Sequence, residues 1–243
     1  MSFTDRFTGH ASAYAAARPS YPPESIDAVL DGLGDPASLV VADIGAGTGI
    51  SSRAIAERGP RVLAIEPNAA MRANAKSDPR IEWIDGTGEA TTLAAASVDV
   101  VAAFQAWHWV DHAAAVAEAR RIVRPGGRLA ALYNERDERD PFTAAYGDII
   151  RRYATDATER RRSDALEAFA QIAPDGVRRS SFVNVHSWDH AGLHKRIDST
   201  SYVPQKGDAY DAMRAEFDAL FATYAREGSV SVHLVTLVVT VDV

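Results

Sequence analysis

Up to about residue 133, short apolar runs alternate with stretches whose apolar residues recur at helical spacing. That alternation is typical of parallel strands joined by helices in an α/β fold. The apolar runs predict five strands, at residues 39–44, 61–66, 81–85, 98–104 and 128–133. Helices are predicted at residues 50–58, 69–76 and 112–124, with Asn68 as an N-cap and a chain reversal at Pro125-Gly126-Gly127. We therefore expect a Rossmann-like, mostly parallel sheet in this half of the chain.

The pattern changes after residue 140. Two helical patterns follow one another between residues 141 and 171 with no strand between them. An alternating strand is predicted at residues 181–188, a helix at 208–226 and a strongly β-branched strand at 230–241. Because no internal repeat or low-complexity linker divides the chain, we expect one domain over residues 1–243.

The first predicted strand runs directly into a glycine-rich turn, Asp43-Ile44-Gly45-Ala46-Gly47-Thr48-Gly49. Glycines at alternating positions between a strand and a helix let bare backbone approach a ligand, which is typical of nucleotide-type cofactors. A dinucleotide fingerprint would place its third glycine at position 50, where this chain has isoleucine, and no P-loop lysine follows. An NAD-dependent oxidoreductase is therefore only an alternative hypothesis.

The acidic-x-G-x-G-x-G loop resembles motif I of the class I S-adenosyl-L-methionine (SAM)-dependent methyltransferases. The end of the fourth predicted strand, Gln105-Ala106-Trp107-His108-Trp109, is similar to segments of a small-molecule branch that includes trans-aconitate methyltransferase-like and ubiquinone-biosynthesis-like enzymes. Residues 7–23 resemble the N-terminal lid of the same branch. The resemblance implies a seven-stranded sheet with helices on both faces and an antiparallel last strand beside the sixth. It also implies a lid over residues 1–24 and a helical cover over residues 134–175.

The resemblance also implies SAM as the cofactor and assigns residues to it. Asp43 would face the cationic methionine amino group, and Glu66, at the end of the second strand, would accept hydrogen bonds from the ribose hydroxyls. The segment after the third strand would hold the adenine, and Tyr14 and Arg18 would close over the SAM carboxylate. The expected cofactor-binding residues are Asp43, Gly45, Ala46, Gly47, Gly49, Glu66, Pro67, Thr87, Gly88, Glu89, Gln105, Tyr14 and Arg18.

The acceptor would lie beside the end of the fourth strand, next to the transferred methyl group. Its expected contacts are Trp107, His108, Tyr133 and Asn134. His108 is the candidate general base, since a histidine titrates near neutral pH. Methyl transfer needs mainly alignment, however, so a structural role for His108 and a packing role for Trp107 stay open. The family thus predicts methyl transfer to an oxygen, nitrogen or carbon nucleophile of a small molecule, with a non-catalytic SAM-binding protein as a further alternative.

The amino-acid composition limits the kinds of site and partner that we expect. The absence of cysteine excludes disulfides and thiolate metal sites, and no metal site of histidine and carboxylate ligands is expected. The net charge of −7 comes from 26 basic and 33 acidic residues, so nucleic acid is not an expected partner. The basic run at residues 159–162 is expected to be a solvated helix face. We expect a cytoplasmic protein without a membrane span that acts as a monomer or homodimer.

Overall fold

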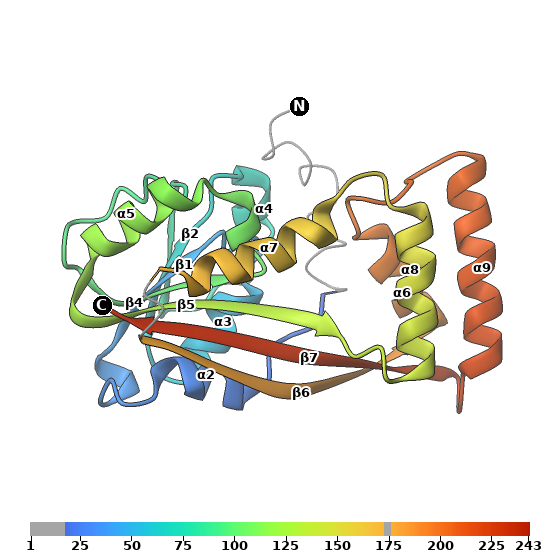
Figure 1. Cartoon of the computed structure of the whole chain (residues 1–243), viewed down its shortest axis with the longest axis horizontal. Coiled ribbons are helices and arrows are strands. Elements are labelled where there is room, and N and C mark those ends of the chain that lie inside the picture. The colour runs from blue at the N-terminus through green and yellow to red at the C-terminus, as the bar shows by residue number, and fades with distance from the viewer. Residues whose placement is uncertain (1–17, 173–175) are drawn as a thin grey trace.

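The computed structural model describes residues 18–172 and 176–243. Its centre is a seven-stranded sheet in the order β3-β2-β1-β4-β5-β7-β6 (Figure 1). Strand β7 pairs antiparallel with both β5 and β6, and the other neighbouring strands are parallel. The strands are β1 (Val40–Ile44), β2 (Arg61–Ile65), β3 (Ile81–Ile84), β4 (Val98–Phe104), β5 (Val123–Arg136), β6 (Val177–Asp189) and β7 (Ser229–Asp242). The predicted fold and its antiparallel last strand are confirmed.

The helices are α2 (Pro23–Leu30), α3 (Ile50–Glu57), α4 (Ala69–Ala73), α5 (His112–Ile122), α6 (Pro141–Tyr153), α7 (Thr158–Ala170), α8 (His190–Asp198) and α9 (Asp208–Tyr224). The described residues also form the short 3₁₀ helices η2 (Pro36–Ser38) and η3 (Trp107–Trp109). Asn68 caps α4 as predicted, because its side chain accepts hydrogen bonds from the amides of Ala70 and Met71. Helices α2 and α8 were not predicted.

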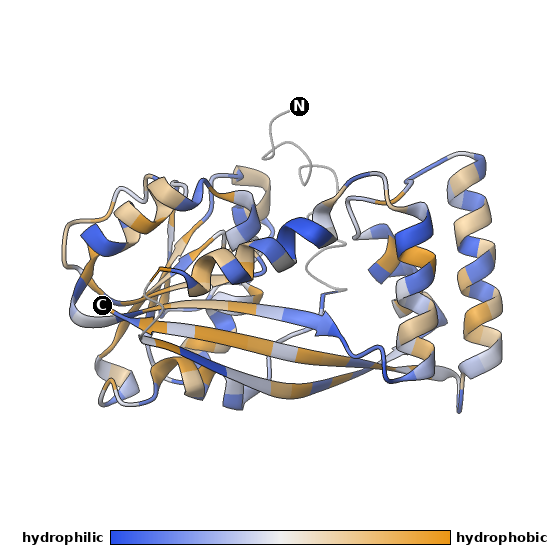
Figure 2. Ribbon diagram, viewed as in Figure 1, coloured by the Kyte–Doolittle hydropathy of each residue, from blue (hydrophilic) through white to orange (hydrophobic). Residues whose placement is uncertain are grey.

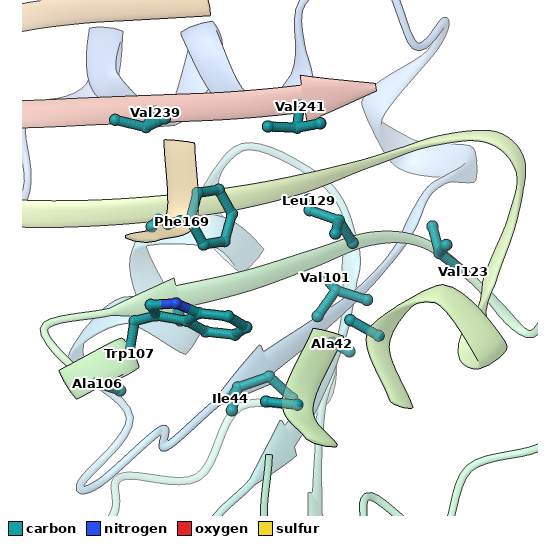
Figure 3. Close-up of a cluster of buried hydrophobic side chains, with 14 of the residues drawn as sticks. Ala42, Ile44, Val101, Ala106, Trp107, Val123, Leu129, Phe169, Val239 and Val241 are labelled. Atoms are coloured by element: carbon teal, nitrogen blue, oxygen red, sulfur yellow. The ribbon is translucent and has the colours of Figure 1, made fainter. Parts of the chain in front are cut away.

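Helices cover both faces of the parallel part of the sheet, which explains why its strands are apolar at successive positions. Val41 and its neighbours on one face pack against α2 and α3. Ala42 and its neighbours on the other face pack against α5 and α7 (Figure 3). The apolar residues consequently concentrate in the sheet and on the inner sides of the helices (Figure 2).

Strand β5 differs from its prediction. It begins at Val123 rather than at residue 128, and helix α5 ends at Ile122. The register explains the difference: Val98 pairs with Val123, whereas Val100 pairs with Arg128, so the Pro-Gly-Gly segment bulges out of an otherwise continuous strand.

Strands β5, β6 and β7 are long, and α6, α8 and α9 gather at one end of them (Figure 1). These helices share a separate hydrophobic cluster that includes Leu193, Phe217 and Val232. The predicted cover over residues 134–175 contains two helices, but they pack in different places. Helix α7 lies against η3 and the sheet, whereas α6 packs against α9. Most of the predicted lid, residues 1–17, lies outside the described residues.

Candidate active site

A pocket of about 930 Å³ opens at the carboxyl ends of β1, β2 and β4, and we call it the loop pocket. It is lined by Ile44, Gly45, Gly47, Glu66, Pro67, Asn68, Met71, Thr87, Gly88, Glu89, Phe104, Gln105, Ala106, Trp109 and Val110. Of the predicted cofactor-binding residues, Gly45, Gly47, Glu66, Pro67, Thr87, Gly88, Glu89 and Gln105 lie on this wall.

The glycine loop takes a backbone shape that other residues rarely adopt. Gly45 has φ +68°, and a Cβ on it would lie 2.7 Å from the Cβ of Ala106. Gly47 has φ +58°, but a Cβ there would meet no protein atom within 4 Å. Gly45 is therefore required by both its φ and its packing, whereas Gly47 presents bare backbone to open pocket. Gly49 caps α3 in a left-handed conformation and does not line the pocket.

Glu66 anchors the loop from the end of β2. Its Oε2 accepts a hydrogen bond of 2.9 Å from the amide of Gly47, and its Oε1 accepts one of 2.8 Å from the amide of Asn68. The side chain is buried, and burial raises the pKa of this carboxyl although the two amide hydrogen bonds oppose the rise. Because each carboxylate oxygen can accept a further hydrogen bond, Glu66 can also bind a pair of hydroxyls in the pocket.

Part of the loop-pocket wall is apolar. A Cβ on Gly88 would lie 2.8 Å from Val110 Cγ1 and 3.0 Å from Ile44 Cγ2, so glycine is needed for this close packing. Met71 and Trp109 add further surface. These walls can enclose a planar ring, as the resemblance implies for adenine. Asn68, Met71, Phe104 and Val110 were missed by sequence reasoning because the matched motifs do not include them.

Asp43 does not point into the loop pocket, contrary to the prediction. It is fully buried, and its Oδ2 accepts hydrogen bonds of 2.7 and 2.6 Å from the hydroxyls of Ser51 and Ser52 in α3. Burial raises its pKa to about 6. Both serines lie in the first turn of α3, so the carboxylate links the start of α3 to the end of β1. Asp43 does not line the loop pocket, although its Oδ1 is buried and has no hydrogen-bond partner among the described residues.

A second pocket of about 870 Å³ lies beside the first, and we call it the arginine pocket. It is lined by Arg18, Pro19, Tyr21, Gly45, Ala46, Gly47, Thr48, Ile50, Ser51, Phe104, Gln105, Asn134, Glu135, Arg136, Tyr146, Arg162, Trp188, Arg196, Val232 and Leu234. Four residues, Gly45, Gly47, Phe104 and Gln105, line both pockets. The two pockets therefore meet at the end of β4, beside the glycine loop.

Gln105 is strained at this junction. It has φ +56°, in the left-handed region that a residue with a Cβ rarely occupies. Its Nε2 donates a hydrogen bond of 3.1 Å to the backbone oxygen of Asn134 at the end of β5. Because backbone strain of this kind persists where the surrounding structure fixes it, and such residues cluster at functional sites, Gln105 is a candidate for the centre of the active site.

Trp107 and Tyr133 lie in the core rather than on a pocket wall, so Trp107 has the packing role that the sequence left open, and the acceptor contact predicted for both residues is not seen. Trp107 is 2% exposed, and its ring lies 5.1 Å from that of Phe169 (Figure 3). The turn of η3 aims Trp107 back onto the sheet face, where α7 covers it. Tyr133 is fully buried, and its hydroxyl accepts a hydrogen bond of 3.1 Å from the amide of His108.

His108 lines a smaller side cavity of about 370 Å³ that shares Arg18, Gln105 and Arg162 with the arginine pocket. Its Nδ1 lies 3.1 Å from the Tyr133 hydroxyl. Burial, and then the positive charges of the nearby arginines, lowers the pKa of His108 to about 3. The imidazole is therefore neutral at physiological pH and a weak base, which argues against the predicted role as general base.

The remaining predicted residues lie around the arginine pocket. Arg18 lines it and donates a hydrogen bond of 2.9 Å to the backbone oxygen of Ser199. Asn134 also lines it, and its Oδ1 accepts a hydrogen bond of 2.5 Å from the hydroxyl of Thr236. Ala46 lies on this wall as well. Tyr14 lies outside the described residues.

Three arginines of the pocket were missed: Arg136, Arg162 and Arg196. The basic run was predicted to be a solvated face, and this is wrong for Arg162, whose side chain is only 13% exposed. Arg160 in the same run is 85% exposed, as predicted. Helical spacing could have shown that Arg160 and Arg162 point in different directions, but not which of them faces the molecule.

Three groups that commonly ligate metals meet away from both pockets, although no metal site was predicted. His190 and His194 are four residues apart in α8, and their Nε2 atoms lie 2.8 and 2.6 Å from Oδ1 of Asp218 in α9. Their spacing of one helical turn is a signal that the sequence analysis overlooked. Hydrogen bonds to the carboxylate already account for this arrangement.

No helix among the described residues combines the length and the apolar composition needed to cross a membrane.

Comparison with known proteins shows what the part of the chain that contains the glycine loop resembles. Residues 42–131 match the family model described as a methyltransferase domain. An uncharacterized methyltransferase of Mycobacterium tuberculosis is 43% identical over 147 residues, which is 60% of this chain and only 59% of the relative's length. An uncharacterized methyltransferase of Schizosaccharomyces pombe is 26% identical over 223 residues, 88% of this chain and 86% of the relative.

Solved structures share the whole fold. A provisionally assigned type II methyltransferase of Anaeromyxobacter dehalogenans has a TM-score of 0.69 and 24% identity, covering 93% of this chain and 97% of that one. Phosphoethanolamine N-methyltransferase 2 of Haemonchus contortus, solved with phosphomonomethylethanolamine and S-adenosylhomocysteine, has a TM-score of 0.56 and 18% identity. That comparison covers 99% of this chain and 60% of the other. At these identities, the likeness shows the fold alone.

Proposed function

We propose that this chain is a class I SAM-dependent methyltransferase, and that it transfers the methyl group of SAM to an oxygen, nitrogen or carbon nucleophile of a small-molecule acceptor. The observation that carries the proposal is the junction of two pockets at the end of β4. Methyl transfer is an in-line displacement, so donor and acceptor must meet end to end. Two adjoining pockets with a shared wall provide that arrangement.

The loop pocket fits the adenosine part of SAM. Glu66 is buried at the pocket wall with oxygens able to accept hydrogen bonds from the ribose hydroxyls, and Gly47 offers bare backbone beside it. The adenine ring would lie against the wall that contains Gly88 and Val110. When bound, SAM supplies a methyl group activated by its positively charged sulfur.

The methionine part of SAM would extend past Gln105 toward the arginine pocket, where an acceptor can lie. Gln105 is held at a fixed position by its hydrogen bond to the backbone of Asn134. The loop and Gln105 would therefore align the nucleophile with the methyl group and exclude water from the line of attack. Alignment is the main contribution we assign to the protein, because His108 is a weak base in the neighbouring cavity.

The matches to methyltransferases weigh against the NAD-dependent oxidoreductase alternative. A non-catalytic SAM-binding protein is separated from an enzyme by turnover. We would incubate the protein with SAM labelled in its methyl group and a pooled extract of small metabolites, and then measure S-adenosylhomocysteine and the labelled products. We expect label in the small-molecule fraction. Binding of SAM without any S-adenosylhomocysteine formation would contradict the proposed activity, and label confined to macromolecules would contradict the small-molecule acceptor.

A further inference from the structure

Positive charge is concentrated in the arginine pocket. Four arginines, from residues 18, 136, 162 and 196, line it together with one carboxylate, that of Glu135, although the whole chain carries a net charge of −7. The four come from segments far apart in the sequence, so the fold brings them together. The positive charge also affects His108. Burial lowers the pKa of this histidine, and the guanidinium groups of Arg162 and Arg18 lower it further.

Buried polar atoms around this pocket lack protein partners. The hydroxyls of Thr48 and Tyr146 and the Nε of Arg162 are buried and have no hydrogen-bond partner among the described residues. Thr48 and Tyr146 are 1% and 3% exposed, and all three side chains line the pocket. A buried hydrogen-bonding group without a partner costs free energy. A ligand rich in acceptor oxygens would satisfy all three.

The arginines are held in place before any ligand binds. Arg162 donates hydrogen bonds of 2.8 Å to Glu135 and to the backbone of Asn134, and Arg196 donates one of 2.8 Å to the Thr200 hydroxyl. Gly147 in α6 makes room for Arg136, since a Cβ there would lie 2.8 Å from its Nε. Figure 2 shows the start of α7 and the end of β5, which carry two of these arginines, as hydrophilic segments. Such preorganisation favours binding of a charged group.

Another part of the pocket wall is apolar or aromatic. Tyr21, Trp188, Val232 and Leu234 lie there, contributed by the segment before α2 and by β6 and β7. A ligand that complements both parts of the wall carries acidic groups on a small carbon skeleton. Inorganic anions would leave the apolar part uncovered.

From this we infer that the methyl acceptor is a small organic anion whose carboxylate or phosphate group binds among the arginines of the arginine pocket. The inference rests on the proposed function. SAM itself adds a positively charged sulfur at the junction. Glu135 already pairs with Arg162, Glu138 pairs with Arg136, and the SAM carboxylate can offset one further guanidinium. An anionic acceptor is favoured by both charges, whereas an ammonium compound would be repelled.

The proposed reaction forms one bond and breaks one bond. A bond forms between the nucleophilic atom and the methyl carbon, and the bond from carbon to sulfur breaks with both electrons going to sulfur. If the nucleophile is an oxygen of the anionic group, no proton has to leave. If it is another atom of the acceptor, any proton on it is released to solvent, and the anionic group serves as an anchor.

The test measures binding by isothermal titration calorimetry at constant ionic strength, with the protein saturated with S-adenosylhomocysteine. The probes are adipate, hexyl phosphate and the uncharged adipamide. We compare the natural protein with Arg162→Gln and Arg196→Gln. Arg160→Gln is the matched control, because Arg160 lies in the same helix and is exposed to solvent. Circular dichroism verifies folding, and Arg196→Gln provides a second variant should Arg162→Gln fold poorly.

We expect at least one anion to bind about tenfold or more tightly than adipamide. The preference should fall by about tenfold or more in each pocket variant, as for loss of a hydrogen bond to a charged group, and stay unchanged in Arg160→Gln. The tighter of the two anions identifies carboxylate or phosphate. Equal binding of all three probes, or full preference in both pocket variants, would overturn the inference. Failure to bind S-adenosylhomocysteine in the first place would instead contradict the proposed function.

Discussion

The loop pocket and the arginine pocket share four residues but are built in opposite ways. The walls of the loop pocket come from one stretch, residues 44–110, and consist mainly of backbone, apolar side chains and the buried Glu66. The arginine pocket takes its walls from residues between 18 and 234, and charged side chains dominate its polar part. A backbone-lined pocket suits one invariant ligand. A pocket lined by side chains from many elements can be adapted to an acceptor without changing the cofactor site.

Substitution of Gly47 should have the largest effect on SAM binding. In Gly47→Val the new side chain projects at φ +58° from a residue that lines both pockets, where the protein itself leaves open space. We expect SAM affinity to fall by about a hundredfold or more, since a β-branched residue is strained at this φ and blocks the approach of the ligand. Calorimetric titration with SAM measures the loss.

Gly126→Val is the matched control. Gly126 also has a positive φ, +80°, with no atom within 4 Å of a Cβ, but it lies in the bulge of β5 away from both pockets. Both variants should lose similar stability, about 1–2 kcal/mol for the left-handed backbone. Equal SAM affinity in the two variants would mean that Gly47 does not touch the cofactor.

Loss of the Glu66 carboxylate should have the next largest effect. Glu66→Ala removes the proposed ribose contacts and the acceptor of the Gly47 amide. We expect SAM affinity to fall by about 1.5–3 kcal/mol, the range for hydrogen bonds to a charged group. Glu82→Ala, on the exposed side of β3, is the control. Unchanged SAM affinity in Glu66→Ala would remove this residue from the site.

Substitution of Asp43 should change how the stability of the folded protein depends on pH. The pKa of Asp43 in the folded protein is about 6, above its ordinary value of 3.8, so the folded state holds more protons than the unfolded state between these values. This group therefore stabilises the protein most below about pH 4, and its contribution is lost as pH rises through 6. In Asp43→Asn this loss is absent.

The variant should gain stability relative to the natural protein between pH 4 and pH 7, by on the order of 3 kcal/mol at most. Urea unfolding at several pH values measures the difference. SAM affinity should change little, because Asp43 lies outside both pockets. Parallel stability curves would contradict the shifted pKa, and a large loss of SAM affinity would restore the role that the sequence suggested.

Substitution of His108 should have the smallest effect, and that effect is on turnover. Because the pKa of His108 lies near 3, His108→Asn is expected to lower turnover by less than about tenfold and to leave the pH profile between 6 and 8 unchanged. The measurement requires an identified acceptor. A limb of the profile near pH 6.5 that disappears in the variant would show that this histidine acts as a base.

The residues that line the loop pocket could be predicted largely from the sequence because the features that bring them together are local. A glycine turn and an acid at a strand end follow one another within about twenty residues, and the parallel strands place them at one edge of the sheet. The prediction failed where direction depends on packing. Asp43 and Trp107 are at the expected positions in the chain, but one points to α3 and the other to α7.

The arginine pocket could not be predicted in the same way. Arg136, Arg162 and Arg196 lie on three elements, and no spacing in the sequence relates them. Helix α8, which carries Arg196, has Gly192 in its first turn, and this glycine weakens its helical pattern. Its start at the Asp189 cap is clear once the structure is known. The arginines of this pocket are therefore brought together only by the tertiary fold, which the sequence pattern does not show.

The central claim is that the cofactor occupies the loop pocket and presents its sulfur to the arginine pocket at Gln105. A crystal structure with S-adenosylhomocysteine tests this most directly. We predict that the ribose hydroxyls donate hydrogen bonds to Glu66, that the adenine lies against Gly88, and that the sulfur lies at the wall shared by the two pockets. Adenosine bound in the arginine pocket, or a sulfur pointing away from Gln105, would contradict the account.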